Sequence, residues 1–207
     1  MLGYYNYTVL LTYLGTLAAF IGMVFATAGN FKGAILCLMA AGFCDMFDGM
    51  VARTRESTRP ERNFGIQIDS LNDLVSFGVF PAVIVHLLAP KNIIATAVCA
   101  GYVLCALIRL AYFNVDELER QEQTDEARKS YRGLPVTTVS LALPLIFCLD
   151  LIPGFPVRTA AALLLLVMAA LFISPFKIGK PATLLPKLIM AVIGVAEIVL
   201  IIFFSQW

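Results

Sequence analysis

The sequence predicts an all-α protein, a polytopic membrane helical bundle of about seven transmembrane helices. Apolar residues make up 60% of the 207-residue chain and charged residues 14%, whereas an ordinary soluble domain carries about 25% charged residues. The mean hydropathy is +0.86. The apolar residues also gather in long stretches, and a helix needs about 20 such residues to cross a bilayer.

Seven apolar segments are expected to be helical, at about 8–28, 33–53, 66–88, 92–113, 135–152, 157–174 and 184–204. The first has no basic n-region and no small-residue cleavage site, so we expect a retained helix and not a signal peptide. Pro153, Gly154 and Pro156 separate the fifth and sixth segments and predict a tight hairpin. The charged connection 114–133 is long enough for an interfacial helix. We expect residues 1–207 to form a single membrane domain, since no internal repeat is visible.

Basic residues outside the helix interiors are distributed unevenly between the two alternating sets of loops. One set holds eleven, namely Arg53, Arg55, Arg59, Arg62, Arg120, Arg128, Lys129, Arg132, Lys177, Lys180 and Lys187, and the other holds Lys32, Lys91 and Arg158. Cytoplasmic loops carry the excess of Lys and Arg in membrane proteins. The asymmetry predicts an integral protein of the cytoplasmic membrane, with the N-terminus and the loop after the second segment in the cytoplasm.

Four aspartates lie within or beside the second and third apolar segments. Asp45 and Asp48 are three residues apart, and Asp69 and Asp73 are four apart, so each pair faces one side of its helix. At about 1.5 Å per residue, both pairs lie roughly 20 Å from the outer ends of their helices. In a hydrocarbon core of about 30 Å, the two pairs are therefore at one level. Agreement between two helices predicts one shared site toward the cytoplasmic face.

The chemistry expected of this site is metal binding. Four converging carboxylates repel one another at low dielectric unless cations neutralise them, and carboxylates at hydrocarbon depth are functional by default. All-oxygen ligation suits Mg²⁺, Mn²⁺ or Ca²⁺, and four aspartates are enough to bridge two metals, as in phosphoryl transfer. An internal salt-bridge network is disfavoured, because Arg109 is the one plausible basic partner at that depth.

The pattern Asp45-x2-Asp48-Gly49-x2-Ala52-Arg53-x11-Gly65-x3-Asp69-x3-Asp73 resembles the signature of the CDP-alcohol phosphotransferases. These integral membrane enzymes move a phosphatidyl-type group from a CDP-linked lipid to an alcohol and release CMP. The resemblance implies the CDP-alcohol phosphotransferase fold, with a family core of six membrane helices. The interval between the arginine and the second glycine is longer than is usual in the family. It leaves open which loop arginine, among Arg53, Arg55, Arg59 and Arg62, contacts the substrate phosphates.

Other segments are similar to those of the membrane-embedded phosphatidylserine synthases within this family. They are Asp69-Ser-Leu-Asn-Asp73-Leu-Val-Ser-Phe-Gly78, Arg109-Leu-Ala-Tyr-Phe-Asn114 and Gly133-Leu-Pro135, although Tyr112 stands where an Arg is common in relatives. The resemblance implies an enzyme that transfers the phosphatidyl group of CDP-diacylglycerol to the hydroxyl of L-serine, giving phosphatidylserine and CMP.

The resemblance also implies roles for the acidic residues. Asp45, Asp48 and Asp69 would hold one divalent cation, and Asp45, Asp69 and Asp73 a second. These cations would be Mg²⁺ or Mn²⁺, with Ca²⁺ as a further occupant. Asp73 would in addition be the catalytic general base that takes the proton from the serine hydroxyl.

Further residues are assigned to the substrates by the same resemblance. Gly49, Ala52 and Gly65 would leave room for the nucleotide, Arg53 would pair with its diphosphate, and Thr54 would touch the nucleotide. For Arg109 two interpretations stay open. It would bind the serine carboxylate or the lipid phosphate, or it would orient an aspartate.

Two alternative functions are weighed against this one. A phosphatidylglycerophosphate or phosphatidylinositol-phosphate synthase of the same family would need a dedicated basic pocket for its phosphorylated acceptor. A divalent-cation transporter would place its site near the midplane of repeated halves, whereas this cluster lies toward one side. The expected partners are CDP-diacylglycerol, L-serine and membrane lipids, with a homodimer left open. No dense Lys/Arg run suggests nucleic acid.

Overall fold

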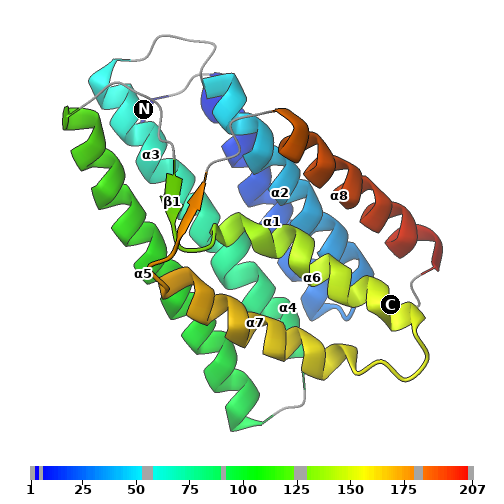
Figure 1. Cartoon of the computed structure of the whole chain (residues 1–207). Helices are drawn as coiled ribbons and strands as arrows, with labels where there is room; N and C mark the ends of the chain where they lie inside the picture. The colour runs from blue at the N-terminus through cyan, green and yellow to red at the C-terminus, as the bar shows by residue number, and fades with distance from the viewer. Residues whose placement is uncertain are drawn as a thin grey trace.

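The computed structural model describes residues 3–4, 7–52, 58–89, 92–123, 130–179 and 184–204. It confirms the predicted all-α bundle (Figure 1). The helices are α1 (Leu10–Thr27), α2 (Phe31–Ala52), α3 (Arg59–Asp73), α4 (Phe80–Leu88), α5 (Ile93–Gln123), α6 (Val139–Cys148), α7 (Val157–Ile173) and α8 (Leu184–Phe204). A π-helical turn (Leu74–Val79) joins α3 to α4, and 3₁₀ turns (Tyr7–Val9, Val136–Thr138, Leu149–Leu151) adjoin α1 and α6. The strands β1 (Ser130–Arg132) and β2 (Lys177–Gly179) form one antiparallel ribbon.

The apolar helices account for the seven predicted segments. Within the described residues, four stretches are long and apolar enough to cross a membrane: Leu10–Thr27, Phe31–Val51, Arg59–Leu88 and Ile93–Arg120. Three shorter apolar helices follow, over Val136–Leu151, Val157–Ile173 and Ile189–Phe203. These helices fit an integral membrane protein.

Helix α1 shows how the bundle is adapted to lipid. Its buried positions hold small residues, Thr12, Gly15, Ala19, Gly22 and Ala26. Its exposed positions hold large apolar ones, Leu10, Leu14, Leu17, Ile21 and Val24. Both sets recur every three or four residues, which is the helical period. Small residues let membrane helices approach closely, and the large exposed ones suit an apolar surrounding.

The chain passes back and forth between the two ends of the bundle. Figure 1 shows the end of α2, the start of α3, the end of α5 and the start of α8 at one end. The α1–α2, α4–α5 and α6–α7 connections lie toward the other end. Gly154 makes the expected tight turn between α6 and α7, with a φ of +80°, a left-handed conformation that glycine adopts readily.

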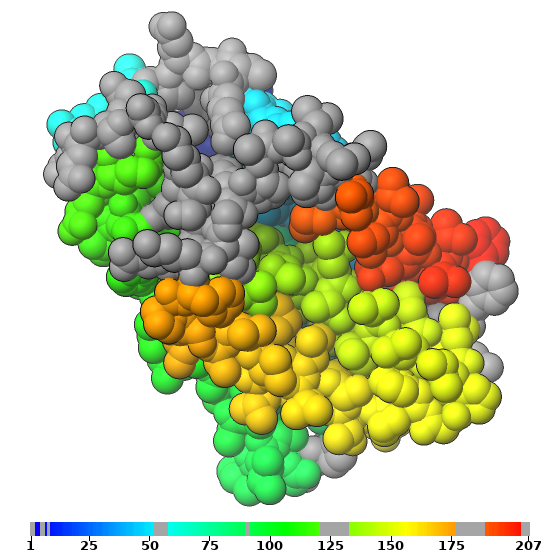
Figure 2. Space-filling view, viewed as in Figure 1, coloured from blue at the N-terminus to red at the C-terminus, as the bar shows by residue number. Residues whose placement is uncertain are grey.

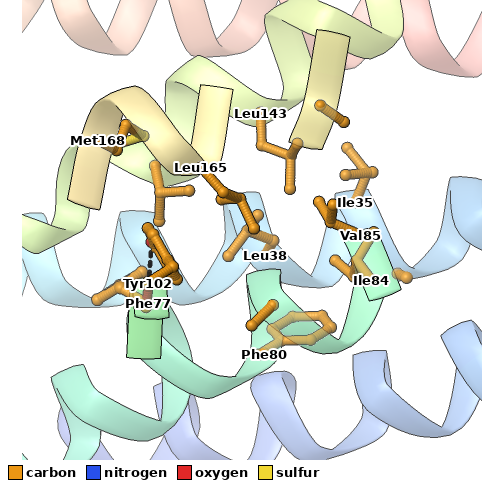
Figure 3. Packing of buried hydrophobic residues seen from close by; sticks show 14 of the residues in the cluster. Ile35, Leu38, Phe77, Phe80, Ile84, Val85, Tyr102, Leu143, Leu165 and Met168 are labelled. Carbon is orange, nitrogen blue, oxygen red and sulfur yellow. Dashed lines mark hydrogen bonds between the residues drawn. The ribbon is translucent and has the colours of Figure 1, made fainter. Parts of the chain in front are cut away.

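The core lies where the middle helices meet. Figure 3 shows residues from α2, the π-helical turn, α4, α5, α6 and α7 packed together, among them Ile35, Leu38, Phe77, Phe80, Ile84, Val85, Tyr102, Leu143, Leu165 and Met168. Helices α6 and α7 lie across one face of the molecule in the space-filling view (Figure 2). The short helices therefore close the bundle over the longer ones.

Two predicted boundaries are wrong. The third segment was expected from about residue 66, but α3 begins at Arg59, where Thr58 and Glu61 form a reciprocal capping box. Polar capping residues fix a helix start that a hydrophobic window does not detect. Residues 114–123 of the charged connection 114–133 do not form a separate interfacial helix, because α5 continues unbroken to Gln123. An ion pair between Arg120 and Glu117, 2.6 Å apart, supports this polar extension.

The close packing of the small residues on α1 predicts that a larger residue there lowers the stability of the fold. A Cβ at Gly22 would collide with the ring of Phe80 and lie 2.7 Å from the Cβ of Cys37, whereas one at Gly101 on α5 would meet nothing within 4 Å. Gly22→Ala should therefore lose about 1–3 kcal/mol of stability through overpacking. Gly101→Ala is the matched control and should be neutral or slightly stabilising. Thermal unfolding of the purified variants in detergent measures both, and equal melting temperatures would contradict the packing described.

Candidate metal centre and active site

Helices α2 and α3 supply the acidic residues. The structure brings Asp45, Asp48 and Asp69 together, with one carboxylate oxygen from each lying within 4.8 Å of the others. Asp73 follows Asp69 by one helical turn, and it lines the same cavity as Asp45 and Asp69. All four carboxylates predicted to share a site thus form one contiguous cluster.

Burial makes this cluster costly unless a cation is bound. Asp48 and Asp73 are only 9% and 8% exposed. The Oδ1 atom of Asp73 is buried and has no hydrogen-bond partner among the described residues. A buried carboxylate without a compensating charge destabilises a fold by roughly several kcal/mol. The all-oxygen donor set and the unpaired oxygen fit a hard divalent cation, and Asp45, Asp48, Asp69 and Asp73 are the residues that would hold it.

A cavity of about 540 Å³ opens beside the carboxylates. Its polar part is formed by Asp45, Asp69, Asp73, Ser70, Arg109, Thr137, Thr138 and Ser140. Its apolar part includes Met39, Phe43, Met46 and Met50 from α2, Leu141 from α6, and Met190 from α8. One cavity thus joins a charged end to an apolar wall, which suits an amphiphilic ligand such as a lipid with a polar headgroup.

A π-helical turn follows directly after Asp73. Such turns are rare and are frequently found at functional sites. Here it spans Leu74–Val79, and the hydroxyl of Tyr102 on α5 donates a 2.6 Å hydrogen bond to the carbonyl of Phe77 inside it. A side chain from a neighbouring helix therefore stabilises the backbone irregularity next to the acidic cluster.

Of the remaining predicted site residues, some line the cavity and others do not. Gly49 lines the cavity, and a Cβ there would meet nothing within 4 Å. A Cβ at Gly65 would also point into open space, but Gly65 does not line this cavity. Arg109 lines it and is buried. Ala52 is the last residue of α2, and only its backbone is described. Arg53 and Thr54 lie outside the described residues.

Other residues at the site were not singled out from the sequence. The hydroxyl of Thr12 on α1 lies 3.4 Å from Oδ2 of Asp48. The hydroxyl of Ser70 donates to the side-chain oxygen of Asn114 and so ties α3 to α5 beside the cavity. Asn114 and Ser70 fall inside the segments that resemble phosphatidylserine synthases, and that resemblance was the available signal for them. Nothing in the sequence marks Thr12.

Comparison with known proteins agrees with this site. The sequence model of the CDP-alcohol phosphatidyltransferase family matches residues 5–203. The chain therefore belongs to the CDP-alcohol phosphatidyltransferase family, a family of enzymes, and the resemblance seen in its aspartate signature is confirmed.

Individual relatives carry serine in their names. A CDP-diacylglycerol–serine O-phosphatidyltransferase of Saccharomyces cerevisiae is 38% identical over 110 residues, covering 52% of this chain and 39% of the relative. An archaetidylserine synthase of Methanothermobacter thermautotrophicus is 28% identical over 166 residues, 80% of this chain and 66% of the relative. A Helicobacter pylori CDP-diacylglycerol–serine O-phosphatidyltransferase is 34% identical over 136 residues, 63% and 54% respectively. The chain thus spans from about two fifths to two thirds of these relatives.

The acidic cluster predicts that Asp69→Asn raises the melting temperature without metal but weakens the stabilisation by added metal. Asp69→Asn should raise the melting temperature in EDTA, because it removes one of three mutually repelling carboxylates. Mn²⁺ should stabilise the unchanged chain by binding its folded state and stabilise the variant much less. Asp150→Asn, outside the cavity, is the control and should leave the response to Mn²⁺ unchanged. An equal Mn²⁺ response of Asp69→Asn and the unchanged chain would rule out a metal site at Asp69.

Proposed function

We propose that this chain transfers the phosphatidyl group of CDP-diacylglycerol to the hydroxyl of L-serine, giving phosphatidylserine and CMP. The observation that carries the proposal is the cluster of Asp45, Asp48 and Asp69 within 4.8 Å, at the charged end of a cavity with an apolar wall. Family membership supports the reaction class, and the serine-specific names of several relatives support the acceptor.

The aspartates define the reacting end of the cavity. Asp45, Asp48 and Asp69 would hold one Mg²⁺ or Mn²⁺, and Asp45, Asp69 and Asp73 a second. Bound cations would neutralise the diphosphate and stabilise the departing CMP. The same carboxylates would fix the position of the lipid diphosphate, and positioning supplies much of the rate in phosphoryl transfer.

Asp73 is the proposed general base. Its Oδ1 atom, buried and without a hydrogen-bond partner among the described residues, would accept the proton of the serine hydroxyl. The serine oxygen would then form a bond to the β-phosphorus of CDP-diacylglycerol, and the bond from that phosphorus to the oxygen of CMP would break. The products are phosphatidylserine, CMP and a proton that Asp73 passes to water.

The two substrates would occupy different parts of the cavity. The fatty chains of the donor suit the wall that includes Met46 and Met190, and the open surface at Gly49 leaves room for the nucleotide. Arg109 lines the same cavity as Asp73, so its guanidinium would pair with the serine carboxylate while the hydroxyl faces the base. Paired hydrogen bonds from Arg to a carboxylate add geometric selectivity.

An acceptor panel tests the proposed reaction. Purified chain with CDP-diacylglycerol and Mn²⁺ or Mg²⁺ should release CMP with L-serine, far less with glycerol 3-phosphate or inositol phosphate, and none in EDTA. Asp45→Asn, Asp48→Asn, Asp69→Asn and Asp73→Asn should each lower turnover by about a hundredfold or more, while Asp150→Asn retains it. Preference for glycerol 3-phosphate, or ion flux without CMP release, would refute the serine assignment or the enzyme assignment respectively.

The same assay separates the acceptor from the donor. Arg109→Lys keeps the charge but loses the planar fork that matches a carboxylate. Its KM for serine should rise more than its KM for CDP-diacylglycerol. Arg120→Lys on the same helix is the matched control, because Arg120 pairs with Glu117 and does not line the cavity. Unchanged serine kinetics in Arg109→Lys would exclude Arg109 from the acceptor site.

We propose in addition that the site faces the cytoplasm. In a background without the five native cysteines, a cysteine replacing Arg59 should be labelled only from the cytoplasmic side. A cysteine replacing Arg158 should be labelled only from the outside. Both positions are exposed, at the start of α3 and in the first turn of α7. Reversed labelling would overturn the orientation and with it the use of cytoplasmic serine.

A further inference from the structure

A second polar cluster lies beside the acidic one and outside the cavity. It consists of Thr16 on α1, Asn72 on α3 and Ser76 in the π-helical turn, and none of the three lines the cavity. Asn72 is 4% exposed and Ser76 is fully buried. Polar side chains inside a membrane bundle are costly and are kept where they serve a function.

Asn72 is the centre of this cluster. Its Oδ1 atom accepts a 2.8 Å hydrogen bond from the hydroxyl of Thr16 and a 3.1 Å bond from that of Ser76. The Thr16 hydroxyl also lies 3.1 Å from the carbonyl of Thr12, so Asn72 is the nearer of its two acceptors. One carbonyl oxygen thus ties together α1, the end of α3 and the π-helical turn.

The position of Asn72 in the chain connects this tie to the carboxylates. Asn72 lies three residues after Asp69 and one before Asp73, on a rigid helix. Any rotation of α3 that moved Asn72 would also move both carboxylates relative to Asp45 and Asp48 on α2. Hydrogen bonds between membrane helices contribute only modestly to stability. If position 72 served packing alone, an apolar side chain would serve equally well there.

We propose that Asn72, with Thr16 and Ser76 as its donors, is a positioning residue for the metal centre. The cluster holds α3 in the rotation that brings Asp69 and Asp73 to the divalent cation shared with α2. This inference rests on the metal site of the proposed function. It assigns α1 a part in the site, through Thr16, besides its packing against α2.

Direct Mn²⁺ binding tests this role without relying on turnover. Titration of the purified full chain in detergent, followed by the electron paramagnetic resonance signal of free Mn²⁺, gives the half-saturating concentration. Thr16→Val removes the hydroxyl at nearly constant volume and should raise that concentration about 10-fold, as loss of outer-shell support does at other metal sites. Thr16→Ser keeps the hydroxyl that donates to Asn72 and should bind Mn²⁺ like the unchanged chain.

A matched control and a second variant keep the test decisive. Thr27→Val alters the same helix at an exposed hydroxyl that donates to the carbonyl of Val24, and it should leave Mn²⁺ binding unchanged. Ser76→Ala removes the other donor to Asn72 and should shift binding in the same direction as Thr16→Val. It supplies the answer if Thr16→Val does not fold.

Three results would overturn the inference. Unchanged Mn²⁺ affinity in Thr16→Val and Ser76→Ala, with or without a loss of thermal stability, would leave the cluster a purely structural role. A similar loss of affinity in Thr27→Val would show a non-specific effect of altering α1. Absence of Mn²⁺ binding by the unchanged chain would overturn the metal site itself, and that failure is distinct because it precedes any comparison of variants.

Discussion

Carboxylates buried in an apolar bundle are costly unless a bound cation or a proton neutralises their negative charge. Asp45, Asp48 and Asp69 lie within 4.8 Å of one another, and Asp73 keeps an oxygen without a hydrogen-bond partner in the described structure. Much of the surrounding structure is understandable from this constraint. The cavity gives a ligand access to the cluster. The hydroxyl of Thr12 on α1 lies beside Asp48, and the hydroxyls of Thr16 and Ser76 hold Asn72.

Close helix packing brings the carboxylates within reach of each other. On α1, Gly22 leaves space that the ring of Phe80 occupies. On α2, a Cβ at Gly42 would lie 2.6 Å from the Cβ of Ser140. The side chain of Ser140 on α6 therefore packs directly against the backbone of α2 at Gly42. The turn before α6 adjoins this contact, and its residues Thr137 and Thr138 line the same cavity as the aspartates. Small residues thus set the dimensions of the site.

The sequence predicts what is local and leaves out what depends on tertiary contacts. The spacing of Asp45, Asp48, Asp69 and Asp73 along two helices was sufficient to predict that the carboxylates cluster. The hydrophobic segments likewise predicted the helices. No local pattern shows that Thr16 lies opposite Asn72, because 56 residues separate them. The π-helical turn was missed because its contact with Tyr102 comes from a neighbouring helix. The continuation of α5 to Gln123 was missed because hydrophobicity does not mark a polar extension, which the ion pair of Arg120 and Glu117 supports.

The most direct test of the account is a count of bound metal. Equilibrium binding of Mn²⁺ to the purified chain, with CDP-diacylglycerol present, should give two ions per chain that are close enough to couple magnetically. The same measurement on a chain with both Asp45→Asn and Asp69→Asn should give none at that concentration. Binding of no Mn²⁺ by the unchanged chain, or equal binding by the double variant, would contradict the claim that these carboxylates form a metal-dependent transfer site.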